Sequence, residues 1–525
     1  MYYIYVKQIV NLFIPNLKSM RSVFNEVANT SISRERFIDF TKIIGLIFLI
    51  SNSFLFLRLE ESGGEIFVTN LSLDSQSLIV ISWFTAGMSL FFFSIGFNNL
   101  IAWYSNVVRD GSQWNYLVDR INTLLGPVLV WIFTSTIFLN IMSRSPIFPK
   151  YLTTAEDGVM PSIEFILWPL WLVSIYLVMV LFAPLTIFLH KKYPYATVLT
   201  LFTITVLIDN IDFSLNFTYI KLFNYLFFWI AIHQLGYFYA DGKIQVINKN
   251  VFRYIAIFAY GYLLYQISVS DKYLSLASYR LSALNNEDPP TTLYLVASIG
   301  LISLVLTLKT FIEKILSNQK LWLLVSHIHA NIYTIYLWHL FIFFIAYLIP
   351  RSFYMVPLFF LITSMLFGNY ERSIFKLSSN LVKRVNPLQP WPSPIKARFS
   401  INNFVLAWFS AVLVLLGVIH LTLGGVGQDG FFTVREFYFL RSNTYEGLGR
   451  ILIGLLLLNI TVRGLKYKKR ILAVSILFII TSIFTRSFVD ESLTNFEIYF
   501  SSVSLLLFII ILFQNSNYKT VSRVK

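Results

Sequence analysis

The sequence predicts an all-α, polytopic integral membrane protein that crosses the bilayer about fourteen times. Hydrophobic residues make up 56% and charged residues 13% of its 525 residues, whereas soluble domains contain about 45–50% and 25%. The apolar residues form long runs, and Lys and Arg gather in alternate connections between these runs. This composition excludes a soluble globular protein, a disordered chain and a coiled coil.

The formal net charge is +15, from 41 Lys and Arg against 26 Asp and Glu. In a soluble protein such a charge would suggest a nucleic-acid partner. Here the basic residues lie between apolar runs, so we interpret them as membrane-topology signals and expect no nucleic-acid binding. The chain contains no Cys, which excludes disulfides, thiol nucleophiles, iron–sulfur clusters and thiolate zinc sites within it.

A helix needs about 20 mostly apolar residues to cross the hydrocarbon, with a range of about 17–25. Runs of this kind, bounded by polar clusters, define the predicted spans. Each span closes its own backbone hydrogen bonds, and strands at β-barrel spacing are not expected. The predicted spans are 41–57, 78–104, 124–142, 163–188, 195–208, 219–240, 250–269, 291–312, 331–349, 352–368, 403–424, 447–462, 470–486 and 498–514.

The connections predict the topology. Even-numbered connections are basic, as in 463–470, and odd-numbered connections are acidic or poor in bases, as in 57–77. Basic connections stay in the cytoplasm, so an even number of spans places both termini there. The expected location is a plasma membrane, the inner membrane of a bacterium, with the lipid bilayer as the first partner. Residues 1–33, apolar but interrupted by Lys7 and Pro15, are expected to be cytoplasmic or interfacial and not a signal peptide.

Four prolines fall within residues 386–400 in a polar context and cannot continue a helix. They predict a boundary, with residues 381–401 as a cytoplasmic linker. The linker would separate a membrane domain of about ten helices, residues 34–380, from an extension of about four helices, residues 402–525.

Several segments in the first domain carry a family resemblance. They are RERFIDFTKIIGLIFLISNS with Arg36, Asp39, Lys42 and Gly45, MSLFFFSIGFNNLIAWYS with Ser94 and Gly96, YLVDRINTLLGPVLVWIF with Arg120 and Pro127, and IYTIYLWHLFIFF around His339. In this order they resemble membrane acyltransferase family 3, whose members O-acylate sugars of cell-surface glycans. The resemblance covers residues 34–380 and leaves the last 145 residues outside it.

The resemblance implies that an acyl group, acetyl in particular, moves from a cytoplasmic acyl-coenzyme A thioester to a sugar hydroxyl of a cell-envelope glycan or a lipid-linked saccharide. It also implies that Lys42 and Arg120 hold the donor's phosphates. Arg binds phosphate oxygens bidentately and Lys supplies a compact charge. The alternative is that both are ordinary inner-leaflet topology charges, and that Lys42 pairs with Asp39 one helical turn away.

Two departures from the family pattern concern the chemistry. The family's first helix carries an Arg and, eleven residues later, a His, and here these positions are Lys42 and Ser53. Acyl transfer to a hydroxyl needs a general base, which imidazole supplies near neutral pH and serine does not. His339 is the remaining candidate base, so we predict His339 and Ser53 as the candidate catalytic residues. The alternative for His339 is a neutral imidazole packed between helices beside Trp338.

A competing hypothesis from a different class stays open. The chain would then be a relative that has lost catalysis and serves as a partner subunit, or a carrier or flippase for a lipid-linked saccharide, so that enzymatic activity is itself undecided. The pair His327 and His329 lacks an Asp, Glu or Cys at ligand spacing, and no metal site is predicted.

Overall fold

The computed structural model describes fourteen stretches of the chain. The predicted N-terminal segment, the Pro-rich linker and the last two predicted spans lie outside them. The described residues are 35–62, 65–70, 81–84, 86–108, 113–143, 160–161, 166–210, 218–269, 290–348, 352–368, 401–424, 435–437, 440–442 and 444–463.

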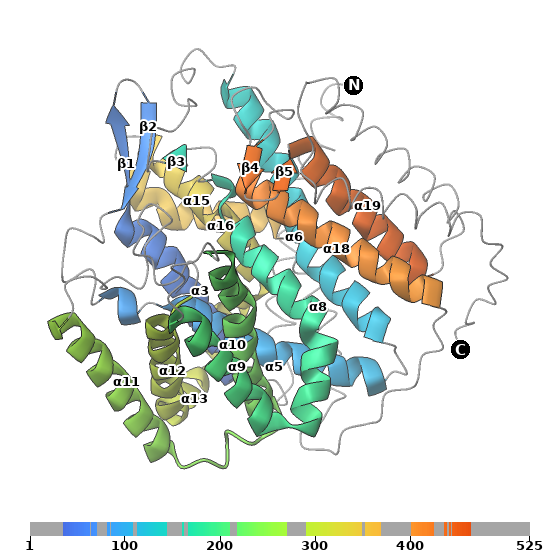
Figure 1. Cartoon of the computed structure of the whole chain (residues 1–525). Helices are drawn as coiled ribbons and strands as arrows, with labels where there is room; N and C mark the ends of the chain where they lie inside the picture. Colours follow the sequence, from blue (N-terminus) through green and yellow to red (C-terminus); the bar gives the residue numbers. More distant parts are fainter. Residues whose placement is uncertain are drawn as a thin grey trace. The chain divides into compact units, whose positions relative to one another are not determined.

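The chain divides into two compact units, each described by itself. Unit 1 is Met1–Arg109, Thr123–Ile166 and Phe182–Ser393, and unit 2 is Asp110–Asn122, Leu167–Leu181 and Pro394–Lys525. Two long helices contribute residues to both units, α6 (Gln113–Ser143) and α8 (Leu170–Lys192). Both are labelled in Figure 1. The other long helices of unit 1 are α3 (Arg36–Phe56), α5 (Gly87–Val108), α9 (Pro194–Asn210), α10 (Asn224–Ala240), α11 (Lys249–Val269), α12 (Thr292–Thr307), α14 (Gln319–Ala330), α15 (Ile332–Leu348) and α16 (Val356–Phe367).

The helical architecture predicted from the sequence is confirmed, but the predicted number of spans is not. Among the described residues, four helices are long and apolar enough to cross a membrane, and six if each of two bent helix pairs counts as one span. The four are Arg36–Leu55, Ile81–Val108, Trp114–Ser135 and Leu170–Lys192. Several other predicted spans, such as Pro194–Asn210, form apolar helices shorter than these.

Two helix pairs are bent at short breaks, one inside a predicted span and one at the start of another. The run 291–312 becomes α12 and α13 (Lys309–Leu316), which meet at 55°, and the run 331–349 begins where α14 turns by 72° into α15. The second break is at Asn331, which is buried and donates its side-chain N–H to the carbonyl of His327, 2.8 Å away. This amide satisfies one of the carbonyls that the end of α14 leaves free.

Glycines allow the helices of unit 1 to touch through their backbones. A Cβ atom added to Gly45 in α3 would lie 2.6 Å from the carbonyl oxygen of Gly87 in α5. A Cβ added to Gly96, further along α5, would lie 2.1 Å from the carbonyl oxygen of His233 in α10. Small residues at such crossings permit close packing where lipid provides no hydrophobic force between helices. These contacts explain two glycines that the family resemblance had matched.

A small sheet is an addition that the sequence analysis did not anticipate. Strands β1 (Leu57–Ser62) and β2 (Glu65–Asn70) form an antiparallel hairpin directly after α3, and β3 (Met160–Pro161) pairs with β2 (Figure 1). The register places Leu57 opposite Asn70 and Ser62 opposite Glu65. Residues 57–62 and 65–70 of the first connection after α3 are therefore held together by strand pairing.

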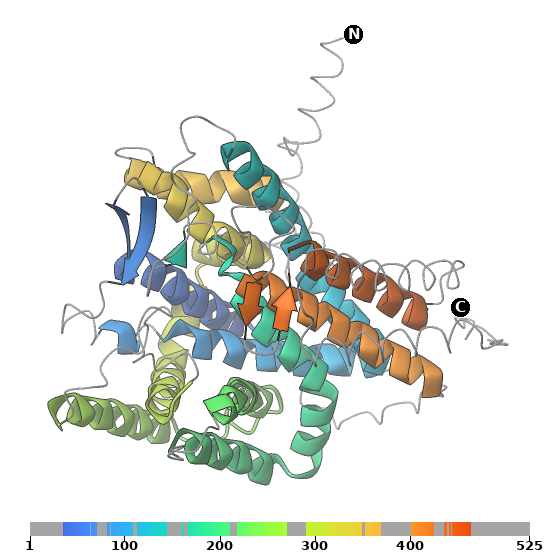
Figure 2. The ribbon, with the colours of Figure 1, turned by 45° about the horizontal axis from the view of Figure 1, so that its top comes forward.

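Unit 2 is built on the helix pair α18 (Ile401–Gly424) and α19 (Thr444–Arg463), which lie side by side in both views (Figures 1 and 2). The short strands β4 (Arg435–Phe437) and β5 (Leu440–Ser442) pair between them. Asn459 of α19 exchanges two side-chain hydrogen bonds with Asn122 of α6, at 3.0 and 3.1 Å. The C-terminal helices thus share polar contacts with a segment from the first half of the chain.

The contact of α3 with α5 generates a first prediction. We expect Gly45→Ala to lower the stability of the folded chain by about 1–3 kcal/mol, because the added methyl group meets the backbone of Gly87. Thermal unfolding in detergent, followed by the loss of the monodisperse fraction, measures this. Gly261→Ala in α11 is the matched control, since nothing lies within 4 Å of the added carbon. Equal melting temperatures for the two variants would contradict the assigned packing.

Candidate functional site

Helix α3 presents two of the predicted site residues on one face. Lys42 and Ser53 are eleven residues apart, and at about 100° per residue this separation brings the helix back to nearly the same direction after three turns. Along the axis the two positions are about 16 Å apart, at 1.5 Å per residue. Helix α3 contacts α15, which carries Tyr333 and His339, the partners of these two residues.

The structure brings Ser53 and His339 together. The hydroxyl oxygen of Ser53 lies 3.2 Å from Nε2 of His339, although 286 residues separate them in the sequence. Ser53 is 1% exposed and His339 is 2% exposed. The aromatic ring of Phe54 meets that of Phe343 edge to face, with centroids 5.1 Å apart, and closes the packing between α3 and α15 next to this pair.

Hydrogen bonding assigns the tautomer of His339. Its Nδ1 faces the carbonyl oxygen of Tyr336, which accepts hydrogen bonds but cannot donate them. Nδ1 therefore carries the proton, and in the neutral imidazole Nε2 is left with a lone pair. The hydroxyl of Ser53 is then the donor to Nε2. The Tyr336 ring stacks on the imidazole at 5.1 Å, which further fixes the orientation of the ring.

This arrangement has the parts of a nucleophile–base pair. A hydroxyl lies within hydrogen-bonding distance of an imidazole nitrogen, and a third group, here the carbonyl of Tyr336, orients the imidazole. The same hydroxyl also lies 3.4 Å from the carbonyl oxygen of Leu49, one turn earlier in α3. The geometry therefore allows a proton to move between Ser53 and His339 without a rotation of either helix.

Lys42 is buried beside aromatic rings in the N-terminal third of α3. Its ammonium donates to the hydroxyl of Tyr333, 3.2 Å away, and lies 4.5 Å from the centre of the same ring and 5.7 Å from the ring of Phe91. Lys42 is 4% exposed. An ammonium has three N–H donors, so the phenol of Tyr333 engages one of them.

Other charged residues surround the start of α3. The Asp39 carboxylate lies 3.2 Å from Nε2 of His329 in α14, a contact that the sequence did not indicate. Arg36 donates to the carbonyl of Leu316, 2.9 Å away, and its guanidinium stacks over Trp322 at 4.8 Å. His329 was missed because an HIH pair offers no metal-ligand spacing, and only the bend between α14 and α15 brings it to α3.

Arg120 belongs to unit 2. It follows Tyr116 by one turn of α6, and its guanidinium interacts with that phenol. Its proposed part in holding a donor together with Lys42 stays a prediction. His233, the other histidine in a predicted span of this region, is bonded to the side chain of Asn99 at 3.0 Å and takes no part in the pair around Ser53.

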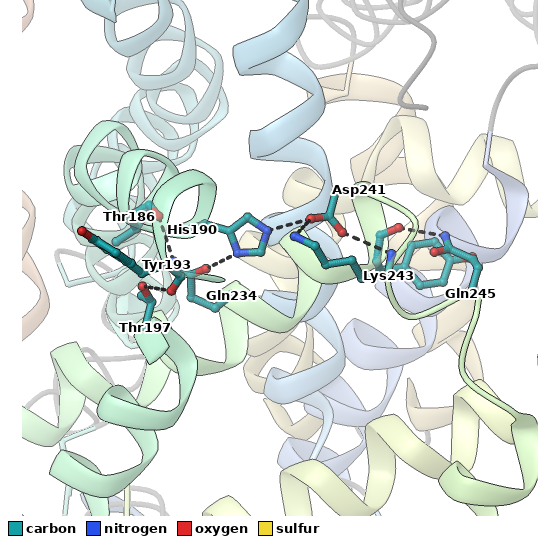
Figure 3. A network of polar contacts seen from close by, with 9 residues as sticks. Thr186, His190, Tyr193, Thr197, Gln234, Asp241, Lys243 and Gln245 are labelled. Atoms are coloured by element: carbon teal, nitrogen blue, oxygen red, sulfur yellow. Dashed lines mark hydrogen bonds and ion pairs between the residues drawn. The ribbon is translucent and has the colours of Figure 1, made fainter. Parts of the chain in front are cut away.

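A second buried polar network lies at the end of α8 (Figure 3). His190, 1% exposed, has Nδ1 at 2.9 Å from the amide oxygen of Gln234 and Nε2 at 3.0 Å from the carboxylate of Asp241. Gln234 in turn donates its N–H to the carbonyl of Thr186 at 3.1 Å. Both ring nitrogens thus face acceptors, which a doubly protonated imidazolium satisfies.

Asp241 is the charged centre of this network. Burial alone would raise the pKa of its carboxyl, but the hydrogen bonds from His190 and Lys243 outweigh burial and hold that pKa below the usual value. The sequence analysis did not single out His190, because it stands in a His-Lys-Lys run that reads as an inner-leaflet anchor. Among the described residues, no group of three or more His, Asp or Glu side chains has a geometry suited to a metal ion.

The network around Asp241 generates a second prediction. We expect Asp241→Asn to lower the free energy of unfolding at pH 7 by about 1.5–3 kcal/mol, the range for hydrogen bonds to a charged group. Because folding lowers the pKa of Asp241 from its unfolded value of 3.8, its stabilisation is complete above pH 3.8. The stabilisation is lost as the pH falls below that value. The free energies of unfolding of the wild type and of Asp241→Asn should therefore converge at acid pH.

Glu313→Gln is the matched control, because it removes a half-exposed carboxylate 3.6 Å from Lys309, a contact of little value for stability. If the difference in the free energy of unfolding between wild type and Asp241→Asn stays constant from pH 7 down to acid pH, the charged network is contradicted.

A known protein-family model matches the region of the chain that contains these residues. The model of the acyltransferase domain of family 3 matches residues 35–367, a stretch that contains Lys42, Ser53 and His339. No curated protein and no solved structure matches the chain. Since the matched stretch is more than half of the chain and the candidate spans are those of an integral membrane protein, the chain belongs to the membrane acyltransferase family 3.

Proposed function

We propose that this protein transfers an acyl group, acetyl in particular, from an acyl-coenzyme A thioester to a sugar hydroxyl of a cell-envelope glycan. The observation that carries the proposal is the hydrogen bond between Ser53 and His339, at 3.2 Å inside the region matched by the family model. The family usually carries a histidine at the position of Ser53. Here an imidazole reaches position 53 from another helix, α15.

The chemistry requires a proton acceptor. In its neutral tautomer, His339 offers the lone pair of Nε2, and the carbonyl of Tyr336 stabilises the positive charge that the ring gains on protonation. The pair is buried, so that water is largely excluded and electrostatic interactions are strong. These features favour transfer of the acyl group to a bound hydroxyl over its loss to water.

The distance between Lys42 and Ser53 along α3 supports a coenzyme A thioester as the acyl donor. Lys42 offers a cation about 16 Å along the helix from Ser53, on the same face. The extended pantetheine arm of a coenzyme A thioester has a similar length, so that a phosphate at Lys42 and the thioester carbon at Ser53 fit one molecule. Arg36 places a further cation near the start of α3, whereas Lys309 at that end is paired with Glu35 at 3.9 Å.

The direction of the helices supports the predicted topology. Asp39, Lys42 and Ser53 of α3 meet His329, Tyr333 and His339 in the same order along the chain. Helices α3 and α15 therefore run the same way, as expected for two odd-numbered spans. We propose that both start at the cytoplasmic face of a bacterial inner membrane, where the donor enters near Lys42, and that the acceptor reaches the pair from the outer side.

We expect His339→Ala to lower the turnover of acetyl transfer by about 10²- to 10⁴-fold, the usual contribution of a general base. The measurement is transfer of labelled acetyl from acetyl-coenzyme A to endogenous glycans in membranes. The control is His233→Ala, which removes an equally buried imidazole bonded to Asn99 outside the site.

If both histidine variants transfer acetyl at the wild-type rate, the assignment of His339 is wrong. If the wild type transfers acetyl to no glycan or lipid-linked saccharide, the proposal fails in favour of a non-catalytic relative or a carrier.

Lys42 is expected to act on donor binding. Lys42→Met should raise the KM for acetyl-coenzyme A by about ten- to a hundredfold, the equivalent of one charge-assisted hydrogen bond, with little change in kcat. Lys42→Arg, which restores the residue typical of the family at this position, should recover most of the affinity. A fall in kcat with unchanged KM in Lys42→Met would place Lys42 in the chemical step and not in donor binding.

A further inference from the structure

The two nitrogens of His339 are both occupied. Nδ1 is bonded to the carbonyl of Tyr336, and the lone pair of Nε2 faces the hydroxyl of Ser53 at 3.2 Å. An acceptor hydroxyl that is to lose its proton to Nε2 must therefore replace the hydroxyl of Ser53. Acylation of Ser53 removes the hydrogen bond from its hydroxyl to Nε2, because an ester oxygen has no hydrogen to donate.

We propose that Ser53 is a covalent nucleophile, and that the acyl group rests on its Oγ as an ester between donor and acceptor. This inference rests on the proposed function and deepens it, because it replaces direct transfer by two successive displacements. Ser53 thereby has a chemical role of its own at the position where the family carries a base.

In the first displacement, Oγ of Ser53 attacks the thioester carbonyl carbon while Nε2 of His339 takes the hydroxyl proton. The new C–O bond forms, the C–S bond breaks, and the proton passes from Nε2 to the leaving thiolate. In the second, a sugar hydroxyl attacks the ester carbonyl and gives its proton to Nε2. The bond to Ser53 breaks, and Oγ recovers the proton from Nε2, so no other reactant is needed.

Burial of the pair suits such an intermediate. Ser53 and His339 are 1% and 2% exposed, so little water reaches an ester at this place before an acceptor arrives. The packing of Phe54 on Phe343 at 5.1 Å adds an apolar wall beside it. The ordinary role of a helix serine is a hydrogen bond to the carbonyl four residues earlier. Here the carbonyl oxygen of Leu49 lies 3.4 Å from Oγ of Ser53, farther than Nε2 of His339 at 3.2 Å, and the single hydroxyl hydrogen can be donated to only one of them.

The test uses the full-length chain in lipid nanodiscs with acetyl-labelled acetyl-coenzyme A and no glycan. After an acid quench, peptide mass spectrometry should find one acetyl group on Ser53, and added glycan should remove it. Ser53→Ala and His339→Ala should abolish the label, and Ser53→Ala should lower transfer at least about a hundredfold. Ser51→Ala, two residues away on the same helix and partly exposed, should keep both label and transfer.

A fluorophosphonate probe tests the nucleophile without any acyl donor, since it reacts with serines activated by a base. It should label Ser53 in the wild type and not in His339→Ala. Size-exclusion chromatography of each variant reports folding, and Ser53→Cys, which keeps a nucleophile, covers the case in which Ser53→Ala does not fold.

The outcomes separate the two proposals. Acetyl transfer by the wild type with no ester on Ser53, and equal transfer by Ser53→Ala, would overturn the covalent step and leave the acyltransferase assignment standing. Labelling of Ser53 by the fluorophosphonate that depends on His339, in a protein that transfers no acetyl, would support the nucleophile and overturn the proposed reaction. No labelling of Ser53 by either reagent would overturn the nucleophile.

Discussion

The orientation of α3 about its own axis is the constraint on which the rest of unit 1 depends. At Gly45 and Gly87 the backbones of α3 and α5 touch, and any side chain at either position would enter the neighbouring helix. This contact fixes the orientation of α3 about its own helix axis. The line through Lys42 and Ser53, about 60–80° around the helix from Gly45, then faces α14 and α15. The same device, Gly96 with Gly236, holds α5 against α10.

Polar groups inside this unit are arranged in pairs between helices. Asp39 meets His329, Lys42 meets Tyr333, and Ser53 meets His339, each pair joining α3 to the α14–α15 segment. Ionisable groups within apolar surroundings are costly unless they find such partners, so these contacts set the register of α3 against the bent pair. The break at Asn331 separates His329, which meets Asp39, from Tyr333 and His339, which meet Lys42 and Ser53.

Sequence reasoning reached the family, the helical class and the separate candidates Lys42, Ser53 and His339. It also showed that the usual histidine is missing. It did not show that Ser53 and His339 touch, since a contact across 286 residues follows from packing and has no local signal. The helix break at Leu308 lies within a continuous apolar run, so hydropathy passes through it, whereas the break at Asn331 coincides with the start of the predicted span 331–349. In the sequence His190 resembles one more basic residue at a membrane surface. Its contact with Asp241, which directly follows α10, depends on the packing of α8 and α10.

The placement of Lys42 and Ser53 on one uninterrupted α-helix has a consequence for how this part of the chain can vary. Each residue added to a helix turns everything beyond it by about 100° and advances it by 1.5 Å. One insertion or deletion between positions 42 and 52 would carry Ser53 away from His339 while leaving Lys42 in place. Residues 43–52 can therefore change in identity, within the packing limits set by Gly45 and by the buried Ile43 and Leu46, but not in number.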